Sequence, residues 1–271
     1  MPSVLSRWLK RLRDRKETQA LKRRAIPDDL WKRTLIRFPF LQRKDDPGAS
    51  ELRRLTALFL DRKEFHAVAP LRLTDAMAVS IAAQAVLPIL RLGLNRYDDF
   101  VGIVVHADQV SAQREVADDD GVVHAYSEVL AGEAVQGGPV MLSWRDVRSA
   151  GGAGGPAYNV VIHEFAHVLD LSNGFANGVP ALPPDINPID WQNQLTASRD
   201  AFRQRAEANA ESCIDPYACE ADEEFFAVCS ESFFVSPLAL QGEDPALYAM
   251  LSRFYKQDPA AEQPDRRSRA S

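Results

Sequence analysis

A His-Glu-x-x-His motif within an apolar segment constrains this chain more than any other feature of its sequence. The segment runs from Asn159 to Asp170, and the motif places His163 and His167 four residues apart. On an α-helix these two imidazoles lie one above the other on the same face, at a spacing that lets both bind one tetrahedral zinc ion. Glu164 follows the first histidine, so its carboxylate lies beside the open coordination position, where it can take a proton from zinc-bound water.

The residues around the motif indicate a buried helix. Positions 160–162, 165–166 and 168–169 are all apolar, so the helix is hydrophobic on nearly every side. Two histidines and a glutamate in such a helix are costly unless a partner stabilises them. A bound metal ion supplies that partner. We therefore expect a zinc site rather than a helix that carries two ordinary histidines.

Length and composition are those of an ordinary globular protein. The chain has 271 residues, 46% hydrophobic content and a formal net charge of −6, which suits one large domain or two small ones. No apolar run is long enough for a transmembrane helix, and the charged N-terminus lacks the apolar stretch of a signal peptide. Three cysteines, Cys213, Cys219 and Cys229, match neither a disulfide framework nor a zinc ribbon. We expect a cytoplasmic protein with reduced thiols.

The N-terminal segment, residues 1–33, is strongly basic. Trp8, Leu9 and Leu12 give its start a weakly amphipathic face, which leaves open a role at a membrane surface or on nucleic acid. We favour a solvated, partly disordered extension over residues 1–26. The rest of the chain is then clearly acidic, which does not suit a nucleic-acid binder, so we expect no direct nucleic-acid partner.

Helical patterns dominate the segment that follows. Pro27 can begin a helix that Pro39 ends, residues 49–65 repeat leucines on one side, and Thr74–Leu87 stops before a proline. Gln84, within the third of these helices, is either a hydrogen-bonding residue of the core or a neighbour of the site. The sequence leaves both open.

Strand-like segments come next. Val101–Val105 is β-branched and apolar, as in a buried strand, and Gly121–Tyr126 is a shorter candidate. Gly138–Trp144 is a third candidate, and Pro139 near its start predicts an edge position. An edge strand beside a protease cleft can pair with an extended peptide substrate, and we expect this strand to do so.

The segments on either side of the metal helix carry no nucleotide signature. Ala150–Pro156 is rich in glycine but lacks the Gly-Lys-Ser/Thr ending of a phosphate loop, and no Rossmann spacing follows. Gly174 is a natural left-handed cap for the helix end. A long polar helix is predicted over roughly 188–210, with Trp191 and Phe202 on its buried side.

Two histidines do not complete a catalytic zinc site, which needs a third protein ligand. His66, His106 and His124 all precede the motif without partner spacing, and no histidine follows His167. A downstream third ligand is therefore a carboxylate. The candidate stretch is 215–234, which reads as a loop running into a helix.

Glu224 and Glu231 stand apart from the other acids of this stretch. Glu220, Asp222 and Glu223 cluster in the first helical turn, where the helix dipole favours them. Glu224 and Glu231 are each followed by residues that should be buried, and their spacing of seven puts them on one face. Glu224 is nearer the helix start and is the better ligand. Glu231 then supports a ligand or forms a structural pair.

Two further residues are candidates beside the metal. Tyr217 lies seven residues before Glu224, and its hydroxyl can donate a hydrogen bond to the oxyanion of a tetrahedral intermediate. Asp170 shares a helix face with His163 and His167, so its carboxylate can accept the free ring N–H of a ligand histidine. The alternative for Asp170 is an exposed carboxylate at a helix end, a position that the helix dipole disfavours.

The motifs together resemble those of the Mlc titration factor A family. The similarity lies in Asn159–Asp170, Gly174–Gly178 and Glu224–Phe234, with further matches at 59–65, 81–85 and 142–146. The resemblance implies an α+β, mainly helical, zincin-like fold, similar to the catalytic core of anthrax lethal factor, with a small mixed sheet packed on the His-Glu-x-x-His helix. We expect one such domain over 27–260 and a disordered tail over 261–271.

The resemblance also implies an activity and a role for each residue. It implies a zinc metallopeptidase of the gluzincin type, with aminopeptidase-like action on short peptides and amino-acid amides. One zinc ion is then held by His163, His167 and Glu224, with Glu164 as general base and Tyr217 as catalytic tyrosine. The loop before Glu224 departs from the family in being more acidic and richer in thiols, which leaves the substrate preference open.

Two other functions compete with peptide hydrolysis. Family members in enteric bacteria are associated with sequestering Mlc, a glucose-responsive transcriptional repressor. A regulatory binding protein with a repressor of this type as partner is therefore the main alternative. A metal-dependent hydrolase acting on non-peptide amides is a weaker third.

Overall fold

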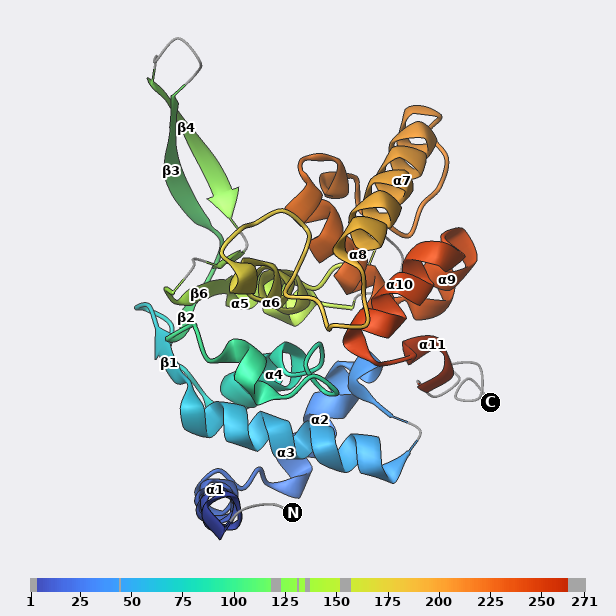
Figure 1. Ribbon diagram of the computed structural model, residues 1–271. Coiled ribbons are helices and arrows are strands. Elements are labelled where there is room, and N and C mark those ends of the chain that lie inside the picture. Colours follow the sequence, from blue (N-terminus) through green and yellow to red (C-terminus); the bar gives the residue numbers. More distant parts are fainter. Residues whose placement is uncertain are drawn as a thin grey trace, which may run out of the picture.

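The computed structural model describes residues 4–43, 45–117, 123–130, 132–134, 137–151 and 157–262. Over these ranges, most of the chain is helical, and one small mixed sheet lies at the left of the view in Figure 1. The expected fold class, α+β and mainly helical, is confirmed. No helix in the described part of the chain combines the length and apolar character needed to cross a membrane.

Four helices form the N-terminal part of the chain, and capping side chains mark the start of two of them. These are α1 (Val4–Arg23), α2 (Asp28–Arg37), α3 (Asp46–Arg62) and α4 (Asp75–Ala85). The Asp45 side chain accepts the Gly48 N–H and caps α3, and Thr74 caps α4 through the Met77 N–H. The leucine repeat at 49–65 therefore belongs to a helix that starts earlier than the pattern alone indicates. It stops at Arg62 because a strand follows.

The flexibility of the extension expected over residues 1–26 stays a prediction. Most of its residues form helix α1. Its second half lies on α3, where Ala20 is buried and Arg23 pairs with Asp61 at 2.9 Å. Contacts with α3 thus order a helix whose sequence is too polar to bury a face of its own. A separate domain boundary at residue 26 stays a prediction.

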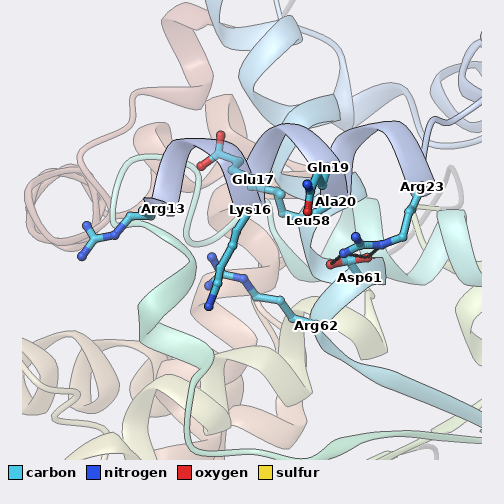
Figure 2. Close-up of a pocket in the computed structure, with 9 residues that line it drawn as sticks. All are labelled: Arg13, Lys16, Glu17, Gln19, Ala20, Arg23, Leu58, Asp61 and Arg62. Atoms are coloured by element: carbon cyan, nitrogen blue, oxygen red, sulfur yellow. Dashed lines mark hydrogen bonds and ion pairs between the residues drawn. The ribbon is translucent and has the colours of Figure 1, made fainter. Parts of the chain in front are cut away.

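An open groove of about 730 Å³ runs between α1 and α3 (Figure 2). Arg13, Lys16 and Arg62 bring positive charge to it, and the Arg23–Asp61 ion pair closes one end. Part of the basic character noted in the sequence therefore lines this groove.

The four-stranded sheet has the order β1-β2-β6-β5. Its strands are β1 (Glu64–Ala67), β2 (Gly102–His106), β5 (Gly132–Ala134) and β6 (Val140–Ser143). Strands β1, β2 and β6 are parallel, and β5 runs antiparallel to β6. The buried strand predicted at 101–105 is β2, which has a neighbour on both sides. Strands β3 (Val110–Ala117) and β4 (Val123–Leu130) form a separate hairpin that extends from the body (Figure 1).

The strand predicted at 138–144 is present, but the prediction that it lies at the edge of the sheet is wrong. It is β6, which pairs with β2 on one side and β5 on the other. Pro139 lies just before the strand begins, so its missing N–H removes no hydrogen bond from the ladder. The edge beside the His-Glu-x-x-His helix, α6 (Val160–Asp170), is the short strand β5 instead.

The C-terminal part of the chain is helical. Its α-helices are α5 (Trp144–Ser149), α6 (Val160–Asp170), α7 (Pro188–Glu207), α8 (Asp222–Val235), α9 (Pro237–Glu243), α10 (Pro245–Tyr255) and α11 (Pro259–Glu262). Helix α7 buries Trp191 and Phe202, as predicted. Gly174 adopts the left-handed conformation, with φ 96°, after a short 3₁₀ turn η3 (Leu171–Asn173), also as predicted. The predicted tail from 263 and the glycine-rich residues 152–156 lie outside the described ranges.

Helix α6 is the centre of the fold. It contacts α4, β5, β6 and α8. On one side, the Phe165 ring packs against Phe59, Tyr97 and Phe100, with centroids 5.7, 4.9 and 5.5 Å away. On the other side lies α8, in which every residue from Phe225 to Val235 is buried. Apolar packing of these two helices leaves their few polar side chains facing one another.

Candidate metal centre

The first turn of α6 is held by a buried network of amides. Asn159 is the N-cap, and its side chain accepts the Ile162 N–H at 3.0 Å. The same side chain donates to Gln84 Oε1 at 2.9 Å, and Gln84 donates to the Ser80 carbonyl at 3.1 Å. Gln84 is therefore a hydrogen-bonding residue of the core. It anchors the start of α6 to α4.

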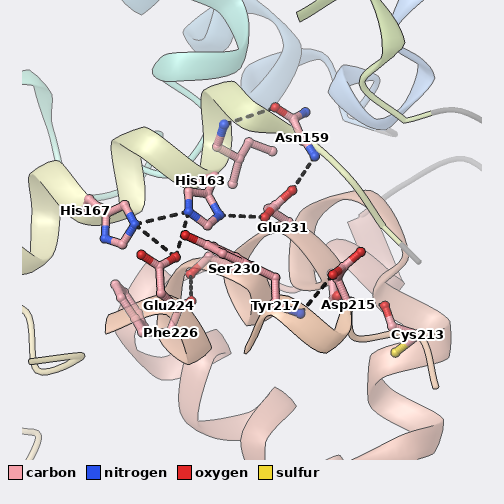
Figure 3. Close-up of polar contacts among 12 residues, drawn as sticks. Asn159, His163, His167, Cys213, Asp215, Tyr217, Glu224, Phe226, Ser230 and Glu231 are labelled. Carbon is pink, nitrogen blue, oxygen red and sulfur yellow. Dashed lines mark hydrogen bonds and ion pairs between the residues drawn. The ribbon is translucent and has the colours of Figure 1, made fainter. Parts of the chain in front are cut away.

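Three side chains predicted as ligands converge between α6 and α8 (Figure 3). His167 Nε2 lies 3.1 Å from His163 Nε2. Glu224 Oε2 lies 3.0 Å from His163 Nε2 and 3.5 Å from His167 Nε2. Among the residues that the structure describes, this is the group of histidine and carboxylate side chains able to hold a metal ion.

The hydrogen bonds around these ligands leave their lone pairs facing inward. His163 donates from Nδ1 to Glu231 Oε1 at 2.8 Å, so its Nε2 is free to present a lone pair. Glu231 also accepts the backbone N–H of Asn159. Glu224 Oε2 is buried and has no hydrogen-bond donor of its own. Three acceptor atoms that face one another in a partly buried space fit a bound cation.

Burial and neighbouring charges shift the pKa values of His163 and Glu224. Burial alone would lower the pKa of His163, but the neighbouring carboxylates of Glu224 and Glu231 raise it well above the usual value. Burial opposes ionisation of Glu224, yet both histidines hold its pKa far below the usual range. The metal-free centre therefore attracts a proton at the position where a divalent cation would bind.

Glu164 points toward the sheet side of the same helix. It is 4% exposed, and burial raises its pKa to about 7, against the opposing effect of His163 and His167. A carboxylate poised in this range can exchange a proton near neutral pH. Its position beside the first ligand is the one that the motif predicts.

Asp170 does not form the expected hydrogen bond to a ligand histidine. Its Oδ2 accepts the backbone N–H groups of Asn177 and Gly178 at 2.9 and 2.8 Å, and its Oδ1 is buried without a hydrogen-bond partner. The side chain is drawn to the loop that follows α6 because two N–H groups there need an acceptor. Glu231, rather than Asp170, supports His163.

Tyr217 reaches the centre from a 3₁₀ turn, η4 (Pro216–Cys219), rather than from an extension of α8. Asp215 caps this turn by accepting the Tyr217 N–H at 2.9 Å. The Tyr217 ring lies 6.0 Å from that of His163, and its side chain points toward His163 and Glu224 (Figure 3). It is 43% exposed, so its hydroxyl is accessible to a ligand.

Sequence reasoning missed two residues at the centre. Asn159 was visible as a polar residue just before an apolar helix, which is an N-cap signature. Tyr158, its neighbour, had no such signal. Burial and the nearby carboxylates of Asp146 and Glu231 raise the pKa of Tyr158, so its hydroxyl stays protonated beside the site.

The three cysteines take no part in the centre. All are free thiols, and Cys229 is fully buried in α8. Burial and Glu243 raise the pKa of Cys213 to about 12, so this thiol is protonated at neutral pH and is a poor nucleophile.

Comparison with known proteins agrees with this geometry. The family model of the glucose-regulated metallo-peptidase M90 matches residues 10–256. The chain belongs to the M90 family. The resemblance seen in its motifs is thereby confirmed, and the three residues predicted as metal ligands lie within the matched range.

Several relatives of this M90 protein carry the name Mlc titration factor A. The protein of that name from Edwardsiella ictaluri is 38% identical over 219 residues, which cover 78% of this chain and 82% of the relative. Those of Pectobacterium atrosepticum and Klebsiella pneumoniae are 35% and 34% identical, and cover 83% and 85% of this chain and 85% and 87% of their own lengths. The metallopeptidase family and the three-ligand centre together indicate a metal-binding protein of the peptidase class.

Proposed function

We propose that this protein is a zinc-dependent metallopeptidase with aminopeptidase-like action on short peptides. The observation that carries the proposal is the set of three inward-facing acceptor atoms on His163, His167 and Glu224, with the Glu164 carboxylate next to them. Two imidazole nitrogens and one carboxylate oxygen form a common ligand set of catalytic zinc, which leaves a fourth position open.

Each residue then has a defined task. The zinc ion, when bound, supplies Lewis-acid activation of the attacking water and of the scissile carbonyl. Glu164 accepts a proton from the water and passes it to the departing amine. Tyr217 donates a hydrogen bond to the oxyanion of the tetrahedral intermediate. Glu231 keeps the His163 ring in the tautomer and orientation that ligation needs.

The sheet supports an extended peptide as substrate. Strand β5 pairs with β6 along one edge, and within the described residues no strand pairs with its other edge. A peptide that adds to that edge lies next to α6 and the metal centre. We therefore propose that β5, rather than the strand at 138–144, pairs with the peptide substrate.

The decisive experiment is hydrolysis of a panel of chromogenic aminoacyl anilides by zinc-loaded protein, with Glu164→Gln in parallel. We expect the wild-type protein to cleave the free-amine substrates and not their N-acetylated forms. The variant should keep its zinc and lose most of the activity. Equal activity in the variant would exclude Glu164 as the base. Cleavage of blocked substrates as well would indicate an endopeptidase.

The names of the relatives support a second function, binding of a transcriptional repressor of the Mlc type. This function uses a protein surface and leaves the metal centre secondary. It is tested by passing cell extract over the immobilised protein. We expect a transcriptional repressor to be retained in a stoichiometric amount. Zinc-loaded protein without activity on any anilide, together with such retention, would favour this function over peptide hydrolysis. The cytoplasmic location expected from the sequence suits either function and stays a prediction.

A further inference from the structure

Gly132 lies directly on the side chain of Glu164. It is the first residue of β5 and pairs with Leu142 of β6. A methyl group on its Cα would lie 2.6 Å from Cγ and 2.7 Å from Cδ of Glu164, and would also overlap Oε1. Contacts this short do not occur between real side chains, so any residue larger than glycine must displace the Glu164 carboxylate or move the strand.

The need for glycine here is steric. Gly132 is absent from the set of glycines with positive φ, unlike Gly137, Gly174 and Gly178. Its backbone is that of an ordinary β-strand, which alanine adopts without strain. The position therefore depends on the missing Cβ alone.

We propose that Gly132 is a positioning residue for the general base. Its bare backbone lets β5 pack onto α6 with the Glu164 carboxylate held between them, so that strand and helix together fix where the base stands. Glu164 is 4% exposed, so a methyl group at Gly132 would push against a side chain that lies among protein atoms rather than in solvent. The part of this inference that concerns catalysis rests on the proposed function, whereas the packing part does not.

The catalytic test compares Gly132→Ala with Gly242→Ala. Gly242, in α9, has nothing within 4 Å of the position that a Cβ would take, so alanine there is a matched control. We expect Gly132→Ala to lower kcat on the preferred anilide by roughly a hundredfold, because a displacement of about 1 Å costs that much. Its bound zinc, measured by elemental analysis, should equal that of the wild type. Unchanged kcat in Gly132→Ala would overturn the proposal.

A double-mutant cycle tests the packing without using activity. Gly132→Ala is made in the wild-type protein and in Glu164→Ala, where the obstructing side chain is gone. We expect the midpoint of thermal unfolding of the zinc-loaded protein to fall by roughly 3–9 °C in the first background. It should be nearly unchanged in the second. Gly242→Ala should shift neither background.

The two readouts separate failure of this inference from failure of the proposed function. If the wild type cleaves no anilide but the cycle shows the coupling, the packing of Gly132 on Glu164 stands and peptide hydrolysis does not. Equal losses of stability in both backgrounds would overturn the inference, because the clash would then lie elsewhere on β5. Gly132→Ala is made in both backgrounds even when it fails to fold in the wild type. If the double variant with Glu164→Ala then folds, the inference is supported. If the double variant also fails to fold, the inference is overturned.

Discussion

Glu231 of α8 accepts the Nδ1–H of His163 over 2.8 Å and the backbone N–H of Asn159. One buried carboxylate thus orients a metal ligand and satisfies the N–H of the residue that caps the same helix. Asn159 in turn donates a hydrogen bond to Gln84 of α4. The helix that carries His163 is therefore tied to both α8 and α4.

Glu231→Gln should weaken zinc binding by roughly 10–100-fold. A glutamine has one acceptor and one donor in place of two acceptors, so it cannot accept from His163 and Asn159 in the same geometry. Competition with a chelator measures the affinity. Glu220→Gln, an exposed acid of the neighbouring turn, is the control and should bind zinc normally. Equal affinities would show that Glu231 has only a structural role.

Glu224→Ala should abolish stoichiometric zinc binding. Removing this carboxylate leaves two histidine ligands, one fewer than a catalytic site needs. Elemental analysis after extensive dialysis measures the metal content, with Glu164→Gln as the variant that keeps it. An unchanged zinc content in Glu224→Ala would place the third ligand elsewhere.

Tyr217→Phe should lower kcat by roughly a hundred- to a thousandfold and leave KM and zinc content near the wild-type values. The reason is that the hydroxyl acts only when negative charge develops on the substrate oxygen. Steady-state kinetics on one anilide measures both constants. A rise in KM with unchanged kcat would assign Tyr217 to substrate binding.

Asn159→Ala should lower the free energy of unfolding by about 2–4 kcal/mol. Loss of the cap costs about 1 kcal/mol, and the buried Gln84 acceptor left without its donor costs about 1–3 kcal/mol more. Asn187→Ala removes a cap of the same residue type from the exposed start of α7 and should cost only about 1 kcal/mol. Chemical denaturation of the metal-free proteins measures both. Equal losses would mean that the bond to Gln84 contributes nothing.

Asp170→Asn should change how stability depends on pH. Burial raises the pKa of Asp170 from 3.8 to about 6. Between these values the folded protein holds a proton that the unfolded chain has lost, so this group's contribution to stability falls as the pH rises through that window. Above about pH 6 the ionised carboxylate costs about 3 kcal/mol.

Asparagine keeps an acceptor for the Asn177 and Gly178 N–H groups and carries no charge. The metal-free variant should therefore match the wild type near pH 4 and be more stable by about 3 kcal/mol at pH 8. Unfolding curves across this range measure the difference. A variant that is less stable at pH 8 would mean that the ionised carboxylate has a favourable partner, as the sequence analysis expected of a ligand histidine.

The sequence predicted the parts of the site that a helical repeat encodes. His163, His167 and Glu164 follow from one motif, and Glu224 and Glu231 from a spacing of seven within a buried helix. Tyr217 was predicted from its spacing of seven residues before Glu224. The structure places it on a separate turn, which Pro216 and the Asp215 cap form. The side-chain direction of Asp170 depends on the loop at 177–178, which no helical periodicity describes.

The sheet was harder to predict than the helices. Strand β5 has three residues, Gly132, Glu133 and Ala134, which is too short for an alternating pattern. Its pairing with β6 is a contact between segments rather than a property of either one. Pro139 led to the wrong prediction of an edge strand, because the sequence does not show that the strand begins only after this proline. The helical order of α1 likewise comes from α3, a distant partner in the chain.

The ligands on α6 and α8 are separated along the chain by residues 168–223, which include the whole of α7. A cation bound by His163, His167 and Glu224 would act as a removable cross-link that closes this long loop. Withdrawing it would leave α6 and α8 joined by apolar packing and Glu231, while the intervening segment gains freedom to open. The supply of such a cation would then set how readily a cellular protease cuts this protein between α6 and α8.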